Sequence, residues 1–344
     1  MYQPVLPELT ELEQIIEEGG DWLQVQQRCR VAVDGTTFPV YSLALGPDRD
    51  DVPAVGFFGG VHGLETIGTH ILLVYLRSLI SRLQWDAVLQ HELESIRLVF
   101  MPLVNPGGMY RHTRANPQGV DLMRNAPVES SEKVPFLLSG QRYSPALPWY
   151  RGEQGEPMQL ESQALCDLVE AELLSRRFSV ALDCHSGFGM QDRIWFPFAS
   201  SREPMPHLPE VHALVSLFGQ TYAHHHYRIE PQSLQYLTHG DLWDYLYQAS
   251  LERPGHTFLP LTLEMGSWMW VKKNPRQLLS RLGFFNPLVP HRKQRVLRRH
   301  LMWLEFLPRA AHSWHNWLPV HYGREQHRQA ALARWYANPV KVKR

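Results

Sequence analysis

The stretch from Ala54 to Glu65 constrains the fold of this chain more than any other segment. Its apolar run predicts a buried strand, which breaks at Gly59 and Gly60 and leads to His62 and Glu65, three residues apart, where we expect a helix to begin. Residues at i and i+3 share a helix face, so both side chains should reach one point at the carboxyl end of the strand. An imidazole nitrogen and a carboxylate oxygen at that point are two of the three protein ligands of a catalytic zinc site.

Taken alone, the His-Glu pair also fits a solvated polar turn at the start of a helix. Two candidates further along the chain favour the metal site. His185 directly follows a predicted strand, 179–183, and is placed to arrive as a third ligand from a separate element. Glu264 ends another predicted strand, 259–263, and provides a second carboxylate. Cys184 is expected in the core, because neighbouring residues of a strand point to opposite sides.

Composition narrows the classes of protein that need to be considered. The chain has 344 residues, 44% of them hydrophobic and 20% charged, which is typical of a soluble globular protein. Lys+Arg 34 against Asp+Glu 34 leaves no net charge, which argues against nucleic acid or an anionic membrane as the main partner. The three cysteines, Cys29, Cys166 and Cys184, cannot form a disulfide framework, so we expect a reducing, cytoplasmic location. No stretch resembles a signal peptide or approaches the length of a membrane span.

Apolar periodicity and turn residues predict the other elements. In chain order they are a helix from about Leu9 to Gln27 interrupted at Gly19-Gly20, a hairpin of strands 29–33 and 37–45 around Asp34-Gly35, a helix over 69–83, a strand over 96–100, a turn at 105–108, a loop region over 108–150 and a helix over 159–174. Strands that alternate with helices predict an α/β fold with polar residues collected along one edge of the sheet.

The segment from Pro290 onward is basic and aromatic. Its cations include Arg295, Arg298 and Arg299, and Trp303 and Phe306 stand beside them. We expect a packed terminal helix with a solvated cationic face, and we place a nucleic-acid role well behind that interpretation.

Five segments, in order, resemble the M14 family of zinc carboxypeptidases, the carboxypeptidase A type. They are His62-Gly63-Leu64-Glu65, Asn105-Pro106-Gly107-Gly108, the run from Arg114 to Asn125, Asp183-Cys184-His185-Ser186-Gly187, and Thr262-Leu263-Glu264-Met265-Gly266. The resemblance implies a mixed, twisted central sheet flanked by helices. It also implies one domain over 1–344 that includes the N-terminal helix and hairpin, 1–50, and the basic helical tail, 290–344.

The resemblance also implies roles for the residues at the metal. His62, Glu65 and His185 would hold one zinc ion per chain and leave an open position for water. Glu264 matches the general base of the family. Asp121 matches a carboxylate that accepts a hydrogen bond from the first zinc histidine and so fixes its orientation.

Two further matches concern the substrate during reaction. Arg114 matches the arginine that steadies the oxyanion of the tetrahedral intermediate. Tyr236 is the best match for the mobile tyrosine that closes over substrate, although the residues after it are spaced differently from the family pattern.

Recognition of the substrate is where this chain departs from the family. Family members usually carry Asn-Arg where this chain has Met123-Arg124, and methionine cannot donate a hydrogen bond. Arg124 can still bind a carboxylate in a bidentate fork. The substrates we expect are a short peptide, a murein fragment or an N-acyl amino acid, as in the related succinylglutamate desuccinylase and aspartoacylase branch. Asp241 or Leu242 should line the side-chain pocket, and the two imply opposite preferences, cationic or apolar.

Two alternatives from other classes stay open. One is a catalytically idle protein that binds zinc and a carboxylate ligand, and the other is an adaptor whose basic C-terminal helix is the working surface. A serine hydrolase is disfavoured because Ser186-Gly187 lacks a Gly-x-Ser-x-Gly elbow. The run His224-His225-His226 has no spaced partner and is expected to be a polar surface segment.

Overall fold

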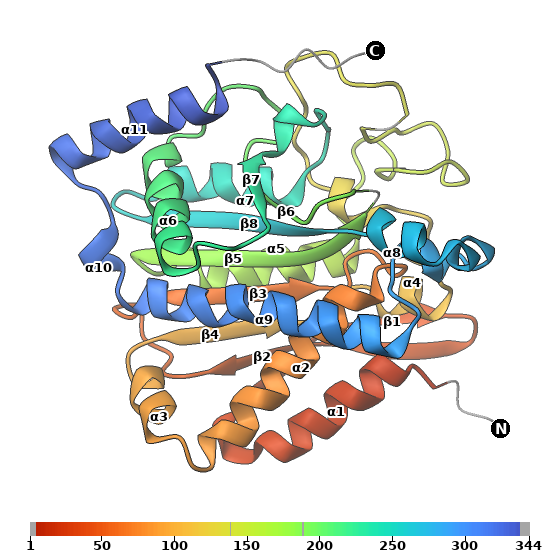
Figure 1. Cartoon of the computed structure of the whole chain (residues 1–344). Helices are drawn as coiled ribbons and strands as arrows, with labels where there is room; N and C mark the ends of the chain where they lie inside the picture. The colour runs from red at the N-terminus through yellow and green to blue at the C-terminus, as the bar shows by residue number, and fades with distance from the viewer. Residues whose placement is uncertain (1–4, 138, 188, 338–344) are drawn as a thin grey trace.

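The computed structural model describes residues 5–137, 139–187 and 189–337. Within them, eight strands form one mixed sheet in the order β1-β2-β4-β3-β5-β8-β6-β7 (Figure 1). The strands are β1 (Gln24–Val33), β2 (Thr36–Leu45), β3 (Ala54–Gly59), β4 (Arg97–Met101), β5 (Phe178–Gly187), β6 (Arg193–Phe196), β7 (Arg228–Pro231) and β8 (Thr257–Gly266). The neighbours β4, β3, β5 and β8 are parallel, so their carboxyl ends share one edge of the sheet.

Helices cover both faces of the sheet (Figure 1). They are α1 (Pro7–Gly19), α2 (Thr66–Leu83), α3 (Ala87–Leu93), α4 (Pro106–Tyr110), α5 (Leu160–Glu172), α6 (Leu208–Thr221), α7 (Leu242–Leu251), α8 (Trp268–Lys273), α9 (Pro290–His312), α10 (Trp314–Trp317) and α11 (His321–Trp335). α2 and α9 contact β3 and β5 on one face, and α5 and α7 pack together on the other. The predicted α/β fold, a mixed central sheet flanked by helices, is confirmed.

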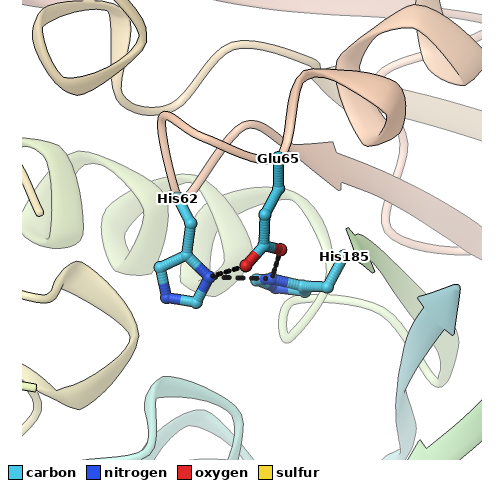
Figure 2. A group of neighbouring side chains, drawn as sticks. All are labelled: His62, Glu65 and His185. Atoms are coloured by element: carbon cyan, nitrogen blue, oxygen red, sulfur yellow. Dashed lines mark hydrogen bonds and ion pairs between the residues drawn. The ribbon is translucent and has the colours of Figure 1, made fainter. Parts of the chain in front are cut away.

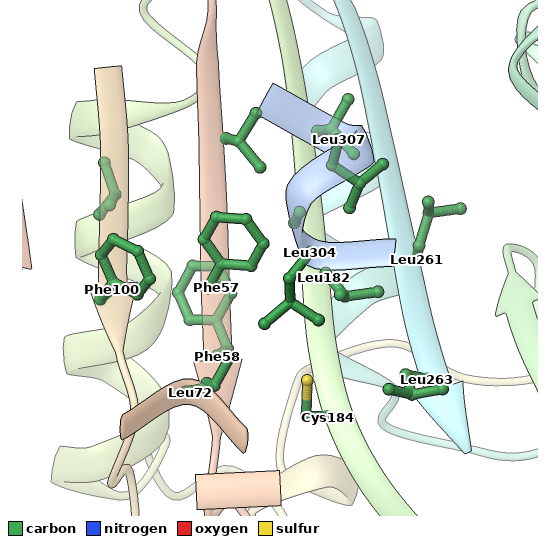
Figure 3. Packing of buried hydrophobic residues seen from close by; sticks show 14 of the residues in the cluster. Phe57, Phe58, Leu72, Phe100, Leu182, Cys184, Leu261, Leu263, Leu304 and Leu307 are labelled. Atoms are coloured by element: carbon green, nitrogen blue, oxygen red, sulfur yellow. The ribbon is translucent and has the colours of Figure 1, made fainter. Parts of the chain in front are cut away.

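The core beneath α9 is built by residues that share a row across four strands. Phe100, Phe57, Leu182 and Leu261 are register partners on β4, β3, β5 and β8, and all are at most 1% exposed. Leu304 of α9 lies against this row (Figure 3). Because side chains alternate along a strand, the residues next to Leu182 on β5 point to the opposite face, where the polar site lies.

Several predicted elements differ from those observed. The helix predicted to reach Gln27 ends at Gly19, because Gly20 takes a positive φ of 46° and the following residues pair with β2. The predicted hairpin is present, with positive φ at both Asp34 and Gly35, as a tight turn of primed type requires. The turn predicted at 105–108 is the start of the short helix α4, where the side chain of Asn105 accepts from the backbone amide of Gly108.

The strands predicted over 179–183 and 259–263 both run further, to Gly187 and Gly266, so His185 and Glu264 lie within strands and not after them. The backbone ladder continues past the end of the apolar run, because it does not depend on side-chain character. The terminal segment forms three helices, α9 to α11, where one was predicted. The face of α9 with Arg295, Arg298 and Arg299 is exposed, as predicted.

Among the described residues, no helix is both long enough and apolar enough to cross a membrane.

The close approach of two loops generates a stability prediction. A Cβ on Gly63 would lie 2.0 Å from the backbone carbon of Gly108, so the turn after β3 abuts α4 with no room for a side chain. Gly63→Ala should lower the free energy of unfolding by about 1–3 kcal/mol, as overpacking does in a tight core. Gly323→Ala on α11 meets nothing within 4 Å and should raise it by up to about 1 kcal/mol. Equal denaturant midpoints for Gly63→Ala and the wild type would contradict this.

Candidate metal centre

Three candidate ligands come from two places in the fold. His62 and Glu65 lie in the connection between β3 and α2, and His185 lies in β5. The backbone amide of Glu65 donates to the carbonyl of His62 at 3.0 Å, and α2 begins only at Thr66. The expectation that the pair shares a helix face is therefore wrong. A tight turn after Gly60, whose φ is +66°, brings the two side chains together instead.

The three side chains converge on one point (Figure 2). Nδ1 of His62 lies 3.0 Å from one oxygen of Glu65, and Nδ1 of His185 lies 3.1 Å from the other. The two Nδ1 atoms are 3.2 Å apart. All three side chains are buried, and in the part of the chain that the structure describes they are the one group of this kind with ligand atoms within 4.8 Å of one another.

Two carboxylates hold the outer nitrogens of these histidines. Nε2 of His62 lies 3.0 Å from Asp121, and Nε2 of His185 lies 2.7 Å from Asp183. A carboxylate fixes the proton on the nitrogen that faces it, so both Nδ1 atoms present lone pairs to the same point. Two facing lone pairs beside a carboxylate repel unless a proton or a metal cation lies between them. The donor set, two imidazoles and one carboxylate, fits a divalent metal ion such as zinc.

Asp183 is a residue of this site that the sequence reasoning missed. It precedes His185 by two positions, and strand alternation puts both on one face once β5 is known to continue to Gly187. Trp243 of α7 donates to the same carboxylate oxygen at 2.9 Å. Asp121 was predicted from the family resemblance, and the structure places it against His62.

Neighbouring charges keep the carboxylates of Glu65 and Asp121 ionised. Burial alone would raise the pKa of Glu65, but the charges and hydrogen bonds of His62 and His185 outweigh burial and lower it. The pKa of Asp121 is lowered in the same way, because Arg114 and His62 offset its burial. The pKa of His185 is raised despite burial, mainly by Asp183. The carboxylates that favour a proton on His185 would also attract a metal cation, and metal binding would release that proton.

Arg114 ties two of these carboxylates together. Its Nε donates to Asp121 at 2.8 Å and one terminal nitrogen donates to Glu65 at 3.2 Å. Burial would lower the pKa of the guanidinium, but these neighbours raise it, so the group stays charged. The side chain is 26% exposed, and it lines the cavity described below.

Glu264 lies beside His185 on the adjacent strand. The two residues are register partners in the parallel pair of β5 and β8. Burial raises the pKa of Glu264 to about 8, and the charge of Glu65 adds to the effect. A Cβ on Gly187 would come within 2.1 Å of the Glu264 carboxylate, so the glycine leaves room for it. A carboxyl group with a pKa near neutrality can both accept and release a proton.

One cavity of about 410 Å³ contains nearly all the predicted site residues. It is lined by His62, Glu65, His185, Glu264, Arg114, Arg124, Met123, Tyr236 and Asp241, and also by Arg193, Trp195, Gln232 and Gln235. The sequence reasoning missed the last four, because β6 and the turn after β7 are too short to show a periodic pattern. Tyr236 packs edge-on against Trp195, with ring centroids 6.2 Å apart.

Only one of the two candidates for the side-chain pocket, Asp241 and Leu242, lines the cavity. Asp241 lines the cavity, whereas Leu242 is fully buried in the hydrophobic core. The expectation that Leu242 could line the pocket is therefore wrong. Asp241 caps α7 by accepting from the amides of Trp243 and Asp244, which turns the first helical residue inward.

The carboxylate-binding candidate Arg124 is only partly satisfied. One terminal nitrogen lies 3.3 Å from Asp241 and 3.2 Å from the carbonyl of Met123. Its buried Nε has no hydrogen-bond partner among the described residues. The guanidinium thus retains donors for a ligand in the cavity.

An α/β fold with a His-Glu-His group at the edge of its parallel strands defines a metallohydrolase-like protein. The family model described as zinc carboxypeptidase, peptidase M14, matches residues 30–266, and the chain belongs to this family. The resemblance found in the sequence is confirmed. Zinc is the metal that this family implies, and the three ligand candidates could hold it.

Carboxypeptidase SOL1 of Arabidopsis thaliana is 30% identical over 93 residues, which are 26% of this chain and 19% of that relative. The alignment thus spans about a fifth of that curated relative. A crystal structure of thrombin activatable fibrinolysis inhibitor is similar to this chain with a TM-score of 0.62 at 18% identity. The match covers 88% of this chain and 74% of the chain in that structure. Carboxypeptidase A of Helicoverpa armigera has a TM-score of 0.61 at 17% identity, with 88% and 71% covered. Both likenesses show the shared fold.

The outer carboxylates generate a prediction about metal affinity. Asp183→Asn and Asp121→Asn should each weaken zinc binding by about 10–100-fold, because the amide no longer fixes the histidine proton on the outer nitrogen. Competition with a zinc-binding chromophore measures the change. Asp86→Asn, which alters a helix cap far from the site, serves as the control and should bind zinc normally. Wild-type affinity in both site variants would contradict the assignment.

Proposed function

We propose that this chain is an active zinc-dependent amidohydrolase that cleaves an amide bond next to a carboxylate-bearing residue. One observation carries the proposal: a single cavity contains the three candidate metal ligands, the carboxyl group of Glu264 and the guanidinium groups of Arg114 and Arg124. These are the groups that metal-assisted hydrolysis of such an amide requires.

His62, Glu65 and His185 would hold one zinc ion per chain. When bound, such an ion supplies a water of lowered pKa and polarises the carbonyl of the substrate. Asp121 and Asp183 keep the two imidazoles in the tautomer whose Nδ1 atoms face the metal position.

Glu264 is the proposed general base. It stands beside His185 across the ladder of β5 and β8, and burial raises its pKa into the range where proton exchange is efficient. Its carboxylate takes the proton of the attacking water and delivers it to the leaving nitrogen. A divalent cation nearby lowers that pKa again, because it favours the charged form.

Arg114 is the proposed stabiliser of the negative charge that develops on the carbonyl oxygen. Asp121 and Glu65 hold its guanidinium in place before substrate arrives, so little reorganisation is needed at the moment of reaction.

Arg124 is the proposed site for the carboxylate of the substrate, with Tyr236 covering the ligand. Its free donors suit a carboxylate, but it shares its charge with Asp241, and Met123 adds no donor. This weaker grip favours a short peptide, a murein-derived peptide or an N-acyl amino acid as substrate. With Leu242 in the core, an apolar side-chain preference loses its basis, whereas Asp241 lines the cavity and keeps a cationic one open.

A screen of metal-loaded protein against peptides with free C-termini, murein fragments and N-acyl amino acids tests the proposed activity. Turnover of N-acyl amino acids without peptides would assign the deacylase alternative. Binding of peptides with no turnover in any class would refute catalysis and leave a zinc- and carboxylate-binding protein.

Glu264→Gln tests the proposed base. The variant should lose at least about 100-fold in kcat, the usual scale of general base catalysis, while its zinc content by mass spectrometry stays at one per chain. His62→Ala, in contrast, should lose the metal. Glu94→Gln, an exposed change, is the control for both. Near-normal turnover by Glu264→Gln would show that another group takes the proton.

Met123→Asn tests the origin of the proposed selectivity. The amide can donate to a substrate carboxylate, so kcat/KM for peptides with a free C-terminus should rise by about tenfold, the scale of one hydrogen bond to a charged group. Met123→Leu keeps the volume without a donor and should change little. No gain in the Asn variant would place the cause of selectivity elsewhere in the cavity.

A further inference from the structure

A second cavity, of about 290 Å³, lies beside the C-terminal half of α2. It is lined by α2, α3, α9 and the start of β4, and it shares no lining residue with the metal cavity. From Thr66, beside the metal ligand Glu65, to Arg82, at the rim of this cavity, α2 rises roughly 24 Å. The apolar wall consists of Leu79, Leu89, Leu93, Ile96, Leu98 and Pro308.

Tyr75 provides an unpaired polar group inside this cavity. Its side chain lines the cavity and is 3% exposed, and its hydroxyl makes no hydrogen bond with any described residue. The hydroxyl oxygen is not one of the fully buried polar atoms that lack a partner, so it is reachable from the cavity and can donate to a ligand there. Burial raises the pKa of this phenol, which keeps the proton in place for donation.

Charges of both signs stand at the rim. Glu305 and Arg309 are one turn apart on α9, a spacing at which an ion pair usually forms, yet neither makes an ion pair within the described chain. Glu92 of α3 is likewise without an ion pair among these residues. Glu305 and Glu92 raise the pKa of Tyr75, and Arg82 and Arg309 lower it, so charges of both signs lie near the hydroxyl.

We propose that this cavity binds a small zwitterion with an apolar body, the chemistry of a free hydrophobic α-amino acid. The ammonium group would lie at Glu305 and Glu92, the carboxylate at Arg309 and the hydroxyl of Tyr75, and the side chain against the apolar wall. A fatty acid or a simple amine would satisfy one sign of charge and leave the other unpaired. The volume is at the small end of the range for ligand sites, which suits a single amino acid.

Calorimetric titration with L-phenylalanine tests the proposal on the full chain. Arg124→Ala removes one carboxylate-binding group from the metal cavity and should still bind L-phenylalanine. Binding in this variant that responds to changes in the second cavity is assigned to the second site. In that background, Glu305→Gln and Tyr75→Phe should each weaken binding by about tenfold, since each removes a hydrogen bond involving a charged group. Glu94→Gln, next to α3 but outside the cavity, is the matched control and should have no effect.

Two analogues separate the contributions of the charges. 3-Phenylpropionate lacks the ammonium group and 2-phenylethylamine lacks the carboxylate, and each should bind about tenfold or more weakly than L-phenylalanine. Absence of L-phenylalanine binding in Arg124→Ala would overturn the proposal. Equal affinity for all three compounds, or unchanged affinity in both Glu305→Gln and Tyr75→Phe, would overturn it as well. None of these outcomes depends on whether the metal centre catalyses hydrolysis.

Discussion

The hydrogen-bonded register between β5 and β8 is the constraint on which the metal centre depends. It sets His185 and Glu264 directly beside each other, at the separation of adjacent strands, about 4.8 Å. The same ladder places Asp183 on the face of His185, where it holds the outer nitrogen. A shift of the β5–β8 register by one residue would turn either His185 or Glu264 toward the apolar core beneath α9. The continuous apolar burial of both strands holds the register against such a slip.

The carboxylates at the site would be costly without compensation. Glu65, Asp121 and Asp183 are buried together, and charges removed from water are tolerated only when they are paired. Arg114 bridges two of them, and the histidines contact all three. A metal cation held by His62, Glu65 and His185 would complete this balance. The buried carboxylates of Asp121 and Asp183 thus also set the tautomers of the two histidines.

Apolar periodicity predicted much of the fold, but it did not predict how far the strands continue through polar residues. The strand at β3 and the helices α2 and α5 were predicted within a few residues, because their apolar faces are regular. Asp183, His185 and Glu264 interrupt the apolar runs, so β5 and β8 were predicted too short, although backbone pairing continues through them. The proximity of His62 to Glu65 was predicted correctly, but for the wrong reason. The prediction placed both on one helix face, whereas a turn before α2 brings them together. Two features of the cavity could not be predicted from a local sequence pattern, because they depend on tertiary packing. They are the lining residues from β6 and the burial of residue 242 in the core.

The metal centre divides its parts between two kinds of backbone. His185 and Glu264 lie near the carboxyl ends of two paired inner strands, where the backbone ladder holds them in place. Arg114, Met123 and Arg124 lie on a long segment with little regular structure. Within that segment, Met123 and Arg124 line the cavity away from the metal ligands, whereas Arg114 and Asp121 contact Glu65 and His62 directly. The architecture therefore keeps His185 and Glu264 on paired strands, while Met123 and Arg124 can change on a loop without altering that pairing.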